Sequence, residues 1–207
     1  MKKLLGFSIF LVFVLIASLT AEAKVTLPAI FSDNMVLQQN TQVNVWGKAA
    51  PGEKVTVKAS WLDKAVTAKA AANGKWTVKL KTPKATTNQS VTVSGENEIT
   101  INNVLIGEVW LCTGQSNMEF PVSRHPDVKW NTGMLNEAEE LKDADYPEIR
   151  LFHVKHQLAH EGELDDCEGE WLVCNPKNLY DFSAVGFVFG RKLYKELKMP
   201  VGLIQST

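Results

Sequence analysis

The sequence lacks both a strong excess of one charge and a stripe of basic residues. Its 22 lysines and arginines stand against 23 aspartates and glutamates, so the formal net charge is −1 over 207 residues. Proteins that bind nucleic acids usually carry clustered positive charge. The balance therefore argues against a nucleic acid as partner.

Cysteine is scarce as well. The three cysteines, Cys112, Cys167 and Cys174, are an odd number, so they cannot all pair within the chain. Cys112 lies in an apolar run and is expected to be a small core residue. Cys167 and Cys174 could close a small loop, but their spacing does not fix the geometry that a disulfide requires. The sequence leaves that pairing open.

A long apolar run occurs at the amino terminus. Lys2 and Lys3 precede an uncharged, apolar stretch over 4–19, and Ala21-Glu22-Ala23 supplies the small residues that signal peptidase reads. The pattern predicts a signal peptide over 1–23 and export to the periplasm or the extracellular space. The run is short for a membrane span and has no stop-transfer flank, so we expect no stable membrane anchor.

Residues 24–104 alternate apolar and polar side chains, the period of strands that bury one face. The alternating apolar positions include Val55, Val57 and Ala59, and Trp76, Val78 and Leu80. Pro51-Gly52 and Asn73-Gly74 fall where hairpin turns are expected, the latter with both residues at positive φ, and Gly95-Glu96-Asn97 marks another reversal. Short strands with regularly spaced turns predict an antiparallel β-sandwich domain.

The pattern changes in residues 105–207. Helix formers gather over 134–144, an apolar strand pattern follows over 149–154, and Ser183 can cap a helix that runs to about 198. A further strand is expected over 201–204. Strands that alternate with helices predict a parallel, flavodoxin-like doubly wound α/β sheet, which we expect to be incomplete because the sequence stops just after a strand.

Ser116 is the candidate catalytic residue. The apolar run over 104–112 ends at Thr113-Gly114, and Ser116 follows, flanked by Gln115 and Asn117. A serine at the carboxyl end of a buried strand can present its hydroxyl beside unpaired N–H groups of a following helix. The alternative is a polar turn that only caps a helix. An α/β-hydrolase elbow would require glycine at position 118, where this chain has methionine.

Five ordered sequence blocks, one of which contains Ser116, resemble sialate O-acetylesterases of the SGNH (GDSL-like) hydrolase superfamily. The blocks are 31–38 (FSDNMVLQ), 106–118 (IGEVWLCTGQSNM), 149–152 (IRLF), 182–186 (FSAVG) and 200–206 (PVGLIQS). The resemblance implies an SGNH hydrolase domain and a carbohydrate O-acetylesterase that acts on O-acetylated sugars, sialic acids in particular. It also implies Ser116 as nucleophile and the amides of Ser116 and Gly186 as oxyanion hole. Gln115 and Asn117 would support the site, with no metal or organic cofactor.

A serine nucleophile also needs a base. The four histidines are His125, His153, His156 and His160, and the last three adjoin an acidic stretch that we interpret as a solvated loop, not a metal site. In the superfamily the catalytic Asp and His form an Asp-x-x-His pair near the end of the domain, and no such pair follows Ser116 in this sequence. The resemblance therefore implies the amino-terminal portion of an enzyme, without its catalytic Asp and His.

Two other functions stay open from the sequence. The chain could be a non-catalytic, exported β-sandwich module that binds carbohydrate, with Trp46, Trp61 or Trp76 as stacking faces. It could also come from an acetylxylan-type esterase, which would use the same serine chemistry on plant polysaccharides.

Overall fold

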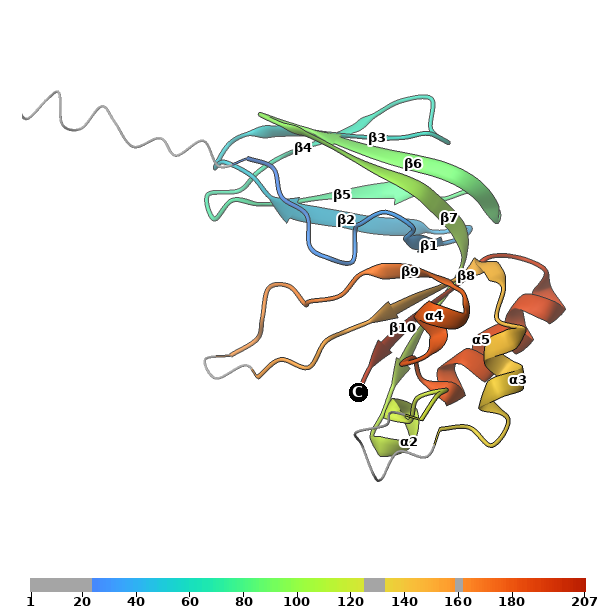
Figure 1. Cartoon of the computed structure of the whole chain (residues 1–207). Coiled ribbons are helices and arrows are strands. Elements are labelled where there is room, and N and C mark those ends of the chain that lie inside the picture. The colour runs from blue at the N-terminus through green and yellow to red at the C-terminus, as the bar shows by residue number, and fades with distance from the viewer. Residues whose placement is uncertain (1–23, 125–132, 159–161) are drawn as a thin grey trace, which may run out of the picture.

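The computed structural model describes residues 24–124, 133–158 and 162–207 (Figure 1). The predicted signal peptide over 1–23, His125 and His160 lie outside the described residues. The described chain is a mixed α/β structure that consists mostly of sheet, which confirms the predicted class. No helix within the described ranges is long and apolar enough to span a membrane.

Strands make up the first part of the described chain, and helices enter after residue 113. The amino-terminal strands are β1 (Val36–Gln38), β2 (Gln42–Lys48), β3 (Lys54–Ala59), β4 (Val66–Lys69), β5 (Lys75–Lys81), β6 (Thr86–Ser94) and β7 (Glu98–Thr113). They are followed by α2 (Ser116–Glu119), α3 (Glu137–Lys142), β8 (Tyr146–His153), β9 (Trp171–Cys174), α4 (Pro176–Leu179), α5 (Ala184–Leu197) and β10 (Val201–Ser206).

Apart from β1, which pairs parallel with β7, the amino-terminal strands form two antiparallel groups around one core. β4, β3, β6 and the first part of β7 lie side by side, whereas β2 pairs with β5. Their inward residues, such as Val45, Val57, Leu80 and Val93, are fully buried in a single hydrophobic cluster. The period-two alternation of the sequence is the cause, since every second side chain leaves water for this core.

Two of the three predicted turns do not form the expected hairpins. Pro51-Gly52 connects β2 to β3, yet β2 pairs with β5 and β3 pairs with β4 and β6. Asn73-Gly74 likewise connects strands of different sheets, and of this pair only Gly74 has a positive φ, 76°. Both expectations were wrong because a turn sequence fixes a reversal but not the sheet to which the next strand belongs. Gly95-Glu96-Asn97 does close a hairpin, with Ser94 opposite Glu98.

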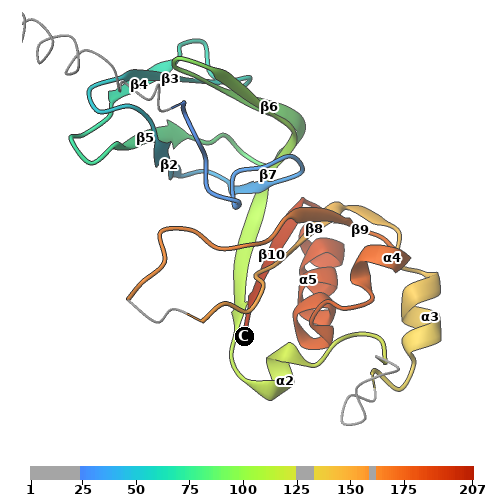
Figure 2. The same cartoon turned by 60° about the vertical axis from the view of Figure 1, so that its left-hand side comes forward.

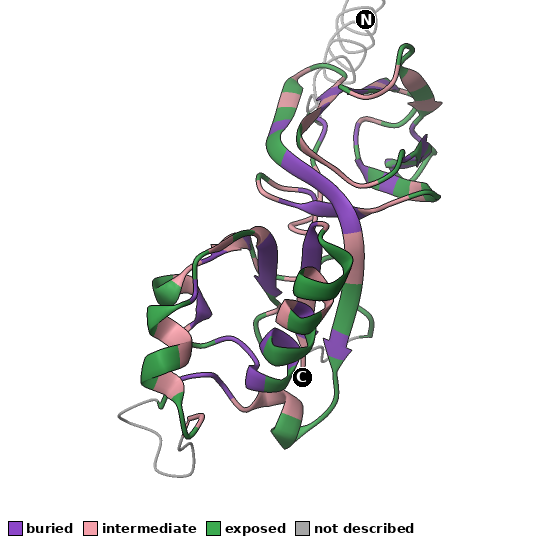
Figure 3. Cartoon of the chain, turned by 90° about the vertical axis from the view of Figure 1, so that its right-hand side faces the viewer, coloured by how far each residue is buried: buried purple, intermediate pink, exposed green. Residues whose placement is uncertain are grey.

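Strand β7 joins the two parts of the chain. Its first residues pair antiparallel with β6, and its last residues, Glu108–Thr113, pair parallel with β10. Figure 3 shows the middle of β7 buried, and Val104, Leu105 and Ile106 are almost completely shielded from solvent. The domain boundary predicted between residues 104 and 105 falls inside this continuous strand, and the division into two domains stays a prediction.

The second part of the chain contains three parallel strands in the order β7-β10-β8. β9, which the sequence did not predict, adds an antiparallel edge next to β8. α5 packs on one face, where Gly190 lets the helix approach Leu203 closely, as Figure 2 shows for the helix and strand. Leu151 and Leu203 join the core beneath α5, whereas Phe152 and Ile204, on the opposite face, pack against the amino-terminal core.

Candidate active site

The carboxyl ends of the three parallel strands meet at one edge of the sheet. Ser206 of β10 lies opposite Thr113 of β7, and Gln205 lies opposite His153, the last residue of β8. Ser116 begins α2 just after β7 ends and therefore lies at this edge, as the sequence predicted. We call this the carboxyl edge.

Ser116 is exposed and is the first residue of the four-residue helix α2. Among the described residues its hydroxyl has no hydrogen-bond partner. The cap of α2 is Gln115, whose side chain makes no capping bond, while its carbonyl accepts from the amides of Met118 and Glu119 at 2.8 and 3.2 Å. The serine is therefore not a helix cap. Its hydroxyl is accessible beside the N–H groups that a helix leaves unpaired in its first turn.

Gly186 lies in the first turn of α5 and is buried. Ser183 is the cap of this helix, as predicted, and its Oγ accepts a hydrogen bond from the Gly186 amide at 3.1 Å. A β-carbon placed on Gly186 would stand 3.2 Å from Sγ of Cys112, near the end of β7. The glycine therefore allows the start of α5 to lie directly against the strand that leads to Ser116.

Contacts between α2 and the start of α5 hold the two candidate elements together. The amide of Ala184 donates to the carbonyl of Phe120 at 2.8 Å, and Pro121 forms an isolated bridge with Ser183. The Ser183 hydroxyl also lies 3.3 Å from Sδ of Met118. These contacts join the end of α2 to the amino terminus of α5, so the short helix that begins with Ser116 lies beside the helical turn that contains Gly186. Asn117 is exposed on α2.

Gln205 is a residue of this edge that sequence reasoning missed. It is completely buried, and its Oε1 accepts from the backbone amide of Ser183 at 2.7 Å. Its Nε2 has no partner among the described residues. The contact fixes the cap of α5 to the last strand. A glutamine directly after Leu203-Ile204 was the available signal, because a polar side chain in an apolar strand requires a buried partner.

Two histidines also lie at the carboxyl edge. His153 ends β8, and His156 Nε2 is 3.8 Å from Oε1 of Glu119 in α2. Partial burial lowers the pKa of His153, His156 lowers it further, and Asp181 and Glu119 oppose the shift. His156 is exposed after the end of β8, as the solvated-loop interpretation requires, but it lies closer to α2 than that interpretation implied, whereas His153 belongs to the strand itself. His153 could have been placed here from its position at a strand end.

All three cysteines are free thiols in the structure, so the pairing of Cys167 with Cys174 that the sequence left open is not formed. Cys112 is buried, which confirms its prediction as a core residue. Burial raises the pKa of Cys174 to about 12, so this thiol is protonated at neutral pH.

Comparisons with known proteins agree with the resemblance. No protein-family model matches the chain. The chain is 32% identical over 199 residues to the mouse sialate O-acetylesterase, covering 86% of this chain and 35% of the mouse protein. It is 30% identical over 195 residues to the human sialate O-acetylesterase, covering 85% of this chain and 35% of the human protein.

A solved structure, that of a carbohydrate acetylesterase from Xanthomonas citri, has the same fold over most of the chain. The TM-score is 0.77 at 31% identity, and the match covers 88% of this chain and 40% of the other. The chain thus spans 35% of the length of the two sialate O-acetylesterases and less than half of the solved enzyme. Over the length that it spans, the chain is similar in sequence to sialate O-acetylesterases and in sequence and fold to a carbohydrate acetylesterase.

Proposed function

We propose that the chain forms part of an exported serine esterase that removes O-acetyl groups from carbohydrates. The observation that carries the proposal is the position of Ser116, exposed at the carboxyl edge with its helix tied to the amino terminus of α5. In the finer fold that we propose, an antiparallel β-sandwich precedes an SGNH hydrolase domain with a doubly wound sheet, of which these residues supply the first strands.

The proposed reaction begins with attack of Ser116 Oγ on the acetyl carbonyl carbon, while a histidine takes the hydroxyl proton. The amides of Ser116 and Gly186 hold the resulting oxyanion. Collapse of this intermediate releases the sugar hydroxyl, which takes up the proton, and leaves an acetyl-serine. Water then attacks the acetyl group and releases acetate. Gln115 and Asn117 line the site in this proposal.

The Gly186 amide already has a partner in the Ser183 hydroxyl at 3.1 Å. For Gly186 to stabilise an oxyanion, this N–H must be shared between the two acceptors, or the Ser183 side chain must turn away when substrate binds. The histidine base is proposed to lie outside the 207 residues, because no Asp-x-x-His pair follows Ser116 in them.

Acetate release from O-acetylated N-acetylneuraminic acid tests the proposal. In the native protein, purified from its source organism, we expect Ser116→Ala to lower kcat/KM by about a thousandfold or more. Ser94→Ala is the matched control and should leave the rate unchanged, since Ser94 lies in β6 and its hydroxyl bonds only to the Glu98 carboxylate among the described residues. Unimpaired turnover by Ser116→Ala would contradict the proposal.

Two further assays refine it. We expect the 207 residues alone to turn over little or no substrate, and robust activity would show that the base lies within them. Acetylated xylan, assayed beside the sialic acid ester, distinguishes a polysaccharide esterase from a sialate esterase. The sialate ester is the first choice because the relatives from mouse and human carry that name.

A further inference from the structure

A cavity of about 420 Å³ lies away from the carboxyl edge, in the connection between β8 and β9 where residues 164–166 cross the pair β2–β5. The size falls in the range of small-ligand pockets. None of the lining residues belongs to the carboxyl edge, so the cavity is separate from the site of Ser116.

The outer face of β2 and β5 forms one wall. In both strands the side chains alternate between the core and the outside, and Trp46, Lys48, Lys75 and Thr77 belong to the outward set. The strands are paired so that Lys48 lies opposite Lys75 and Trp46 opposite Thr77. Two ammonium groups therefore stand side by side next to an indole ring.

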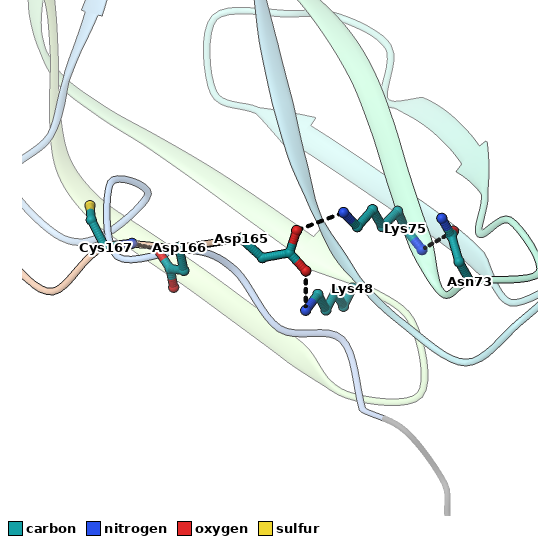
Figure 4. Close-up of polar contacts among 6 residues, drawn as sticks. All are labelled: Lys48, Asn73, Lys75, Asp165, Asp166 and Cys167. Carbon is teal, nitrogen blue, oxygen red and sulfur yellow. Dashed lines mark hydrogen bonds and ion pairs between the residues drawn. The ribbon is translucent and has the colours of Figure 1, made fainter. Parts of the chain in front are cut away.

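Asp165 bridges the two lysines from the opposite wall. Its Oδ1 accepts from Nζ of Lys75 at 2.7 Å, and its Oδ2 lies 3.0 Å from Nζ of Lys48 (Figure 4). A lysine ammonium has three donors, and this contact uses one from each. Each carboxylate oxygen likewise keeps a lone pair. The cluster thus holds charged donors and acceptors at the cavity, and each of these groups can still form a hydrogen bond with a ligand.

Two tryptophans complete the lining. Trp46 is 42% exposed, and Phe31 packs against it edge-on, with ring centroids 4.6 Å apart and an interplanar angle of 80°. Its ring is therefore held in place while part of it faces solvent. Trp76 is buried, and its Nε1–H has no hydrogen-bond partner among the described residues. Gly47 is paired with Trp76, and a β-carbon on Gly47 would collide with the carbonyl of Thr26 and would meet the Trp76 ring at 2.9 Å.

The charges of the cavity decide what kind of ligand it suits. Lys48 and Lys75 are balanced by Asp165 and Asp166, so the lining has no net formal charge. An anionic ligand would be attracted by the two lysines but repelled by both carboxylates. A hydroxyl can accept from an ammonium and donate to a carboxylate at once, and a flat aromatic ring offers an apolar surface to the C–H face of a pyranose.

We propose that this cavity binds one pyranose ring of a neutral oligosaccharide, with Trp46 against the ring and Lys48, Lys75 and Asp165 on its hydroxyls. The site is independent of Ser116 and of the esterase reaction. It gives the amino-terminal strands a role in holding a glycan.

The test is binding of xylotriose, of lactose and of the methyl glycoside of N-acetylneuraminic acid to the whole chain, followed by ligand-observed NMR and calorimetry. We expect at least one of the two neutral sugars to bind with a Kd near 1 mM, more tightly than the anionic one. Trp46→Ala should weaken that binding by about tenfold or more. Trp110→Ala is the matched control, since Trp110 is also 42% exposed but lies on β7 outside the cavity. The Trp110→Ala variant should bind the neutral sugar as tightly as the parent does.

Asp165→Asn separates the polar contacts from stacking. It preserves the shape of the side chain but removes the charge that orders the two lysines, and we expect it to weaken binding several-fold with Trp46 intact. The Ser116→Ala variant should bind the neutral sugar as tightly as the parent does. A failure of the proposed esterase function would therefore not affect this result. Failure of both neutral sugars at about 10 mM, equal binding by Trp46→Ala in a folded chain, or tighter binding of the anionic sugar would each overturn the proposal.

Discussion

The hydroxyl of Ser183 accepts a hydrogen bond from the amide of Gly186 at 3.1 Å, and the amide of Ser183 in turn donates to Gln205 at 2.7 Å. The last strand thus positions the cap, and the cap positions the glycine that we propose for the oxyanion hole. The same bond that stabilises α5 also occupies the amide that catalysis would need. Substitutions at positions 183 and 186 separate these two effects.

Ser183→Ala is expected to destabilise the fold without abolishing the reaction. Loss of the cap bond should lower the free energy of unfolding by about 1 kcal/mol, measured by urea denaturation. Because the variant frees the Gly186 amide, acetate release by the native protein should stay within about tenfold of the parent. Ser183→Thr, which retains a hydroxyl, is the control for stability. A loss as large as that of Ser116→Ala would instead give the Ser183 hydroxyl a direct part in the reaction.

Gly186→Ala should have the opposite profile. Its new β-carbon would stand 3.2 Å from Cys112 Sγ and 3.3 Å from Ser183 Oγ, a tight fit. The better helix propensity of alanine, up to about 1 kcal/mol, offsets that cost, so we expect little change in Tm. The methyl group shields the amide from substrate, and kcat/KM should fall roughly a hundredfold. An unchanged rate in the folded variant would remove Gly186 from the proposed oxyanion hole.

Gly190→Ala, one helical turn further along α5, is the control for that experiment. A β-carbon there would collide with the side chain of Leu203, which is completely buried and cannot move aside freely. We expect a loss of about 1–3 kcal/mol in unfolding free energy, with the activity of the folded fraction retained. Gly186→Ala should therefore lower the rate with little loss of stability, whereas Gly190→Ala should lower the stability with little loss of rate.

Local sequence signals predicted the elements that frame the site. Ser183 as a cap predicted a helix to about 198, and α5 runs over Ala184–Leu197. The apolar runs before Ser116 and after Pro200 predicted strands that are β7 and β10. Such signals depend only on neighbours in the chain, so the position of Ser116 at the end of a strand was predictable.

The features that were missed depend on pairing between distant residues. β9 has only four residues, and it becomes a strand because it pairs with β8. The Pro51-Gly52 turn predicted a hairpin, but the shared core places the two flanking strands in different sheets. His153 and Gln205 lie opposite each other at the carboxyl edge only because β10 inserts beside β8. Each residue carried a local signal in the sequence, but the strand order that brings the two together was not available from periodicity, so neither was predicted for the site.

Arg150 links two of the sequence blocks that resemble the acetylesterases. It is buried, and its guanidinium donates to Oδ1 of Asn34 at 3.0 Å, to Oδ1 of Asn103 at 3.4 Å and to the carbonyl of Pro147 at 3.0 Å. Burial lowers the pKa of Arg150, and Glu148 opposes the shift. We expect Arg150→Met to lower the free energy of unfolding by about 1–3 kcal/mol, since the buried guanidinium loses three hydrogen bonds to acceptors that stay partly open to water.

Arg150→Lys should recover only part of this stability, because an ammonium cannot reproduce the planar set of donors. The control is Lys155→Met, which removes an exposed cation whose Nζ lies 3.7 Å from Glu168, and it should change stability by less than about 0.5 kcal/mol. Urea denaturation of the three variants measures the ranking. Equal stability of Arg150→Met and the parent would mean that the link between the blocks contributes nothing.

The ion pairs of Asp165 should make the stability of the fold depend on pH only in the acid range. Hydrogen bonds from Lys75 and then Lys48 lower its pKa from 3.8 to about 2. Because the folded pKa is below the unfolded one, the carboxylate stabilises the fold fully above pH 3.8, and this contribution is lost as the pH falls through about 2. Asp165→Asn should therefore differ from the parent in Tm at pH 6 and converge with it towards pH 2. High salt should shrink the difference at pH 6, since the cluster is exposed. An NMR titration of the Asp165 carboxyl with a midpoint near 3.8 would show that the two lysines do not hold it in solution.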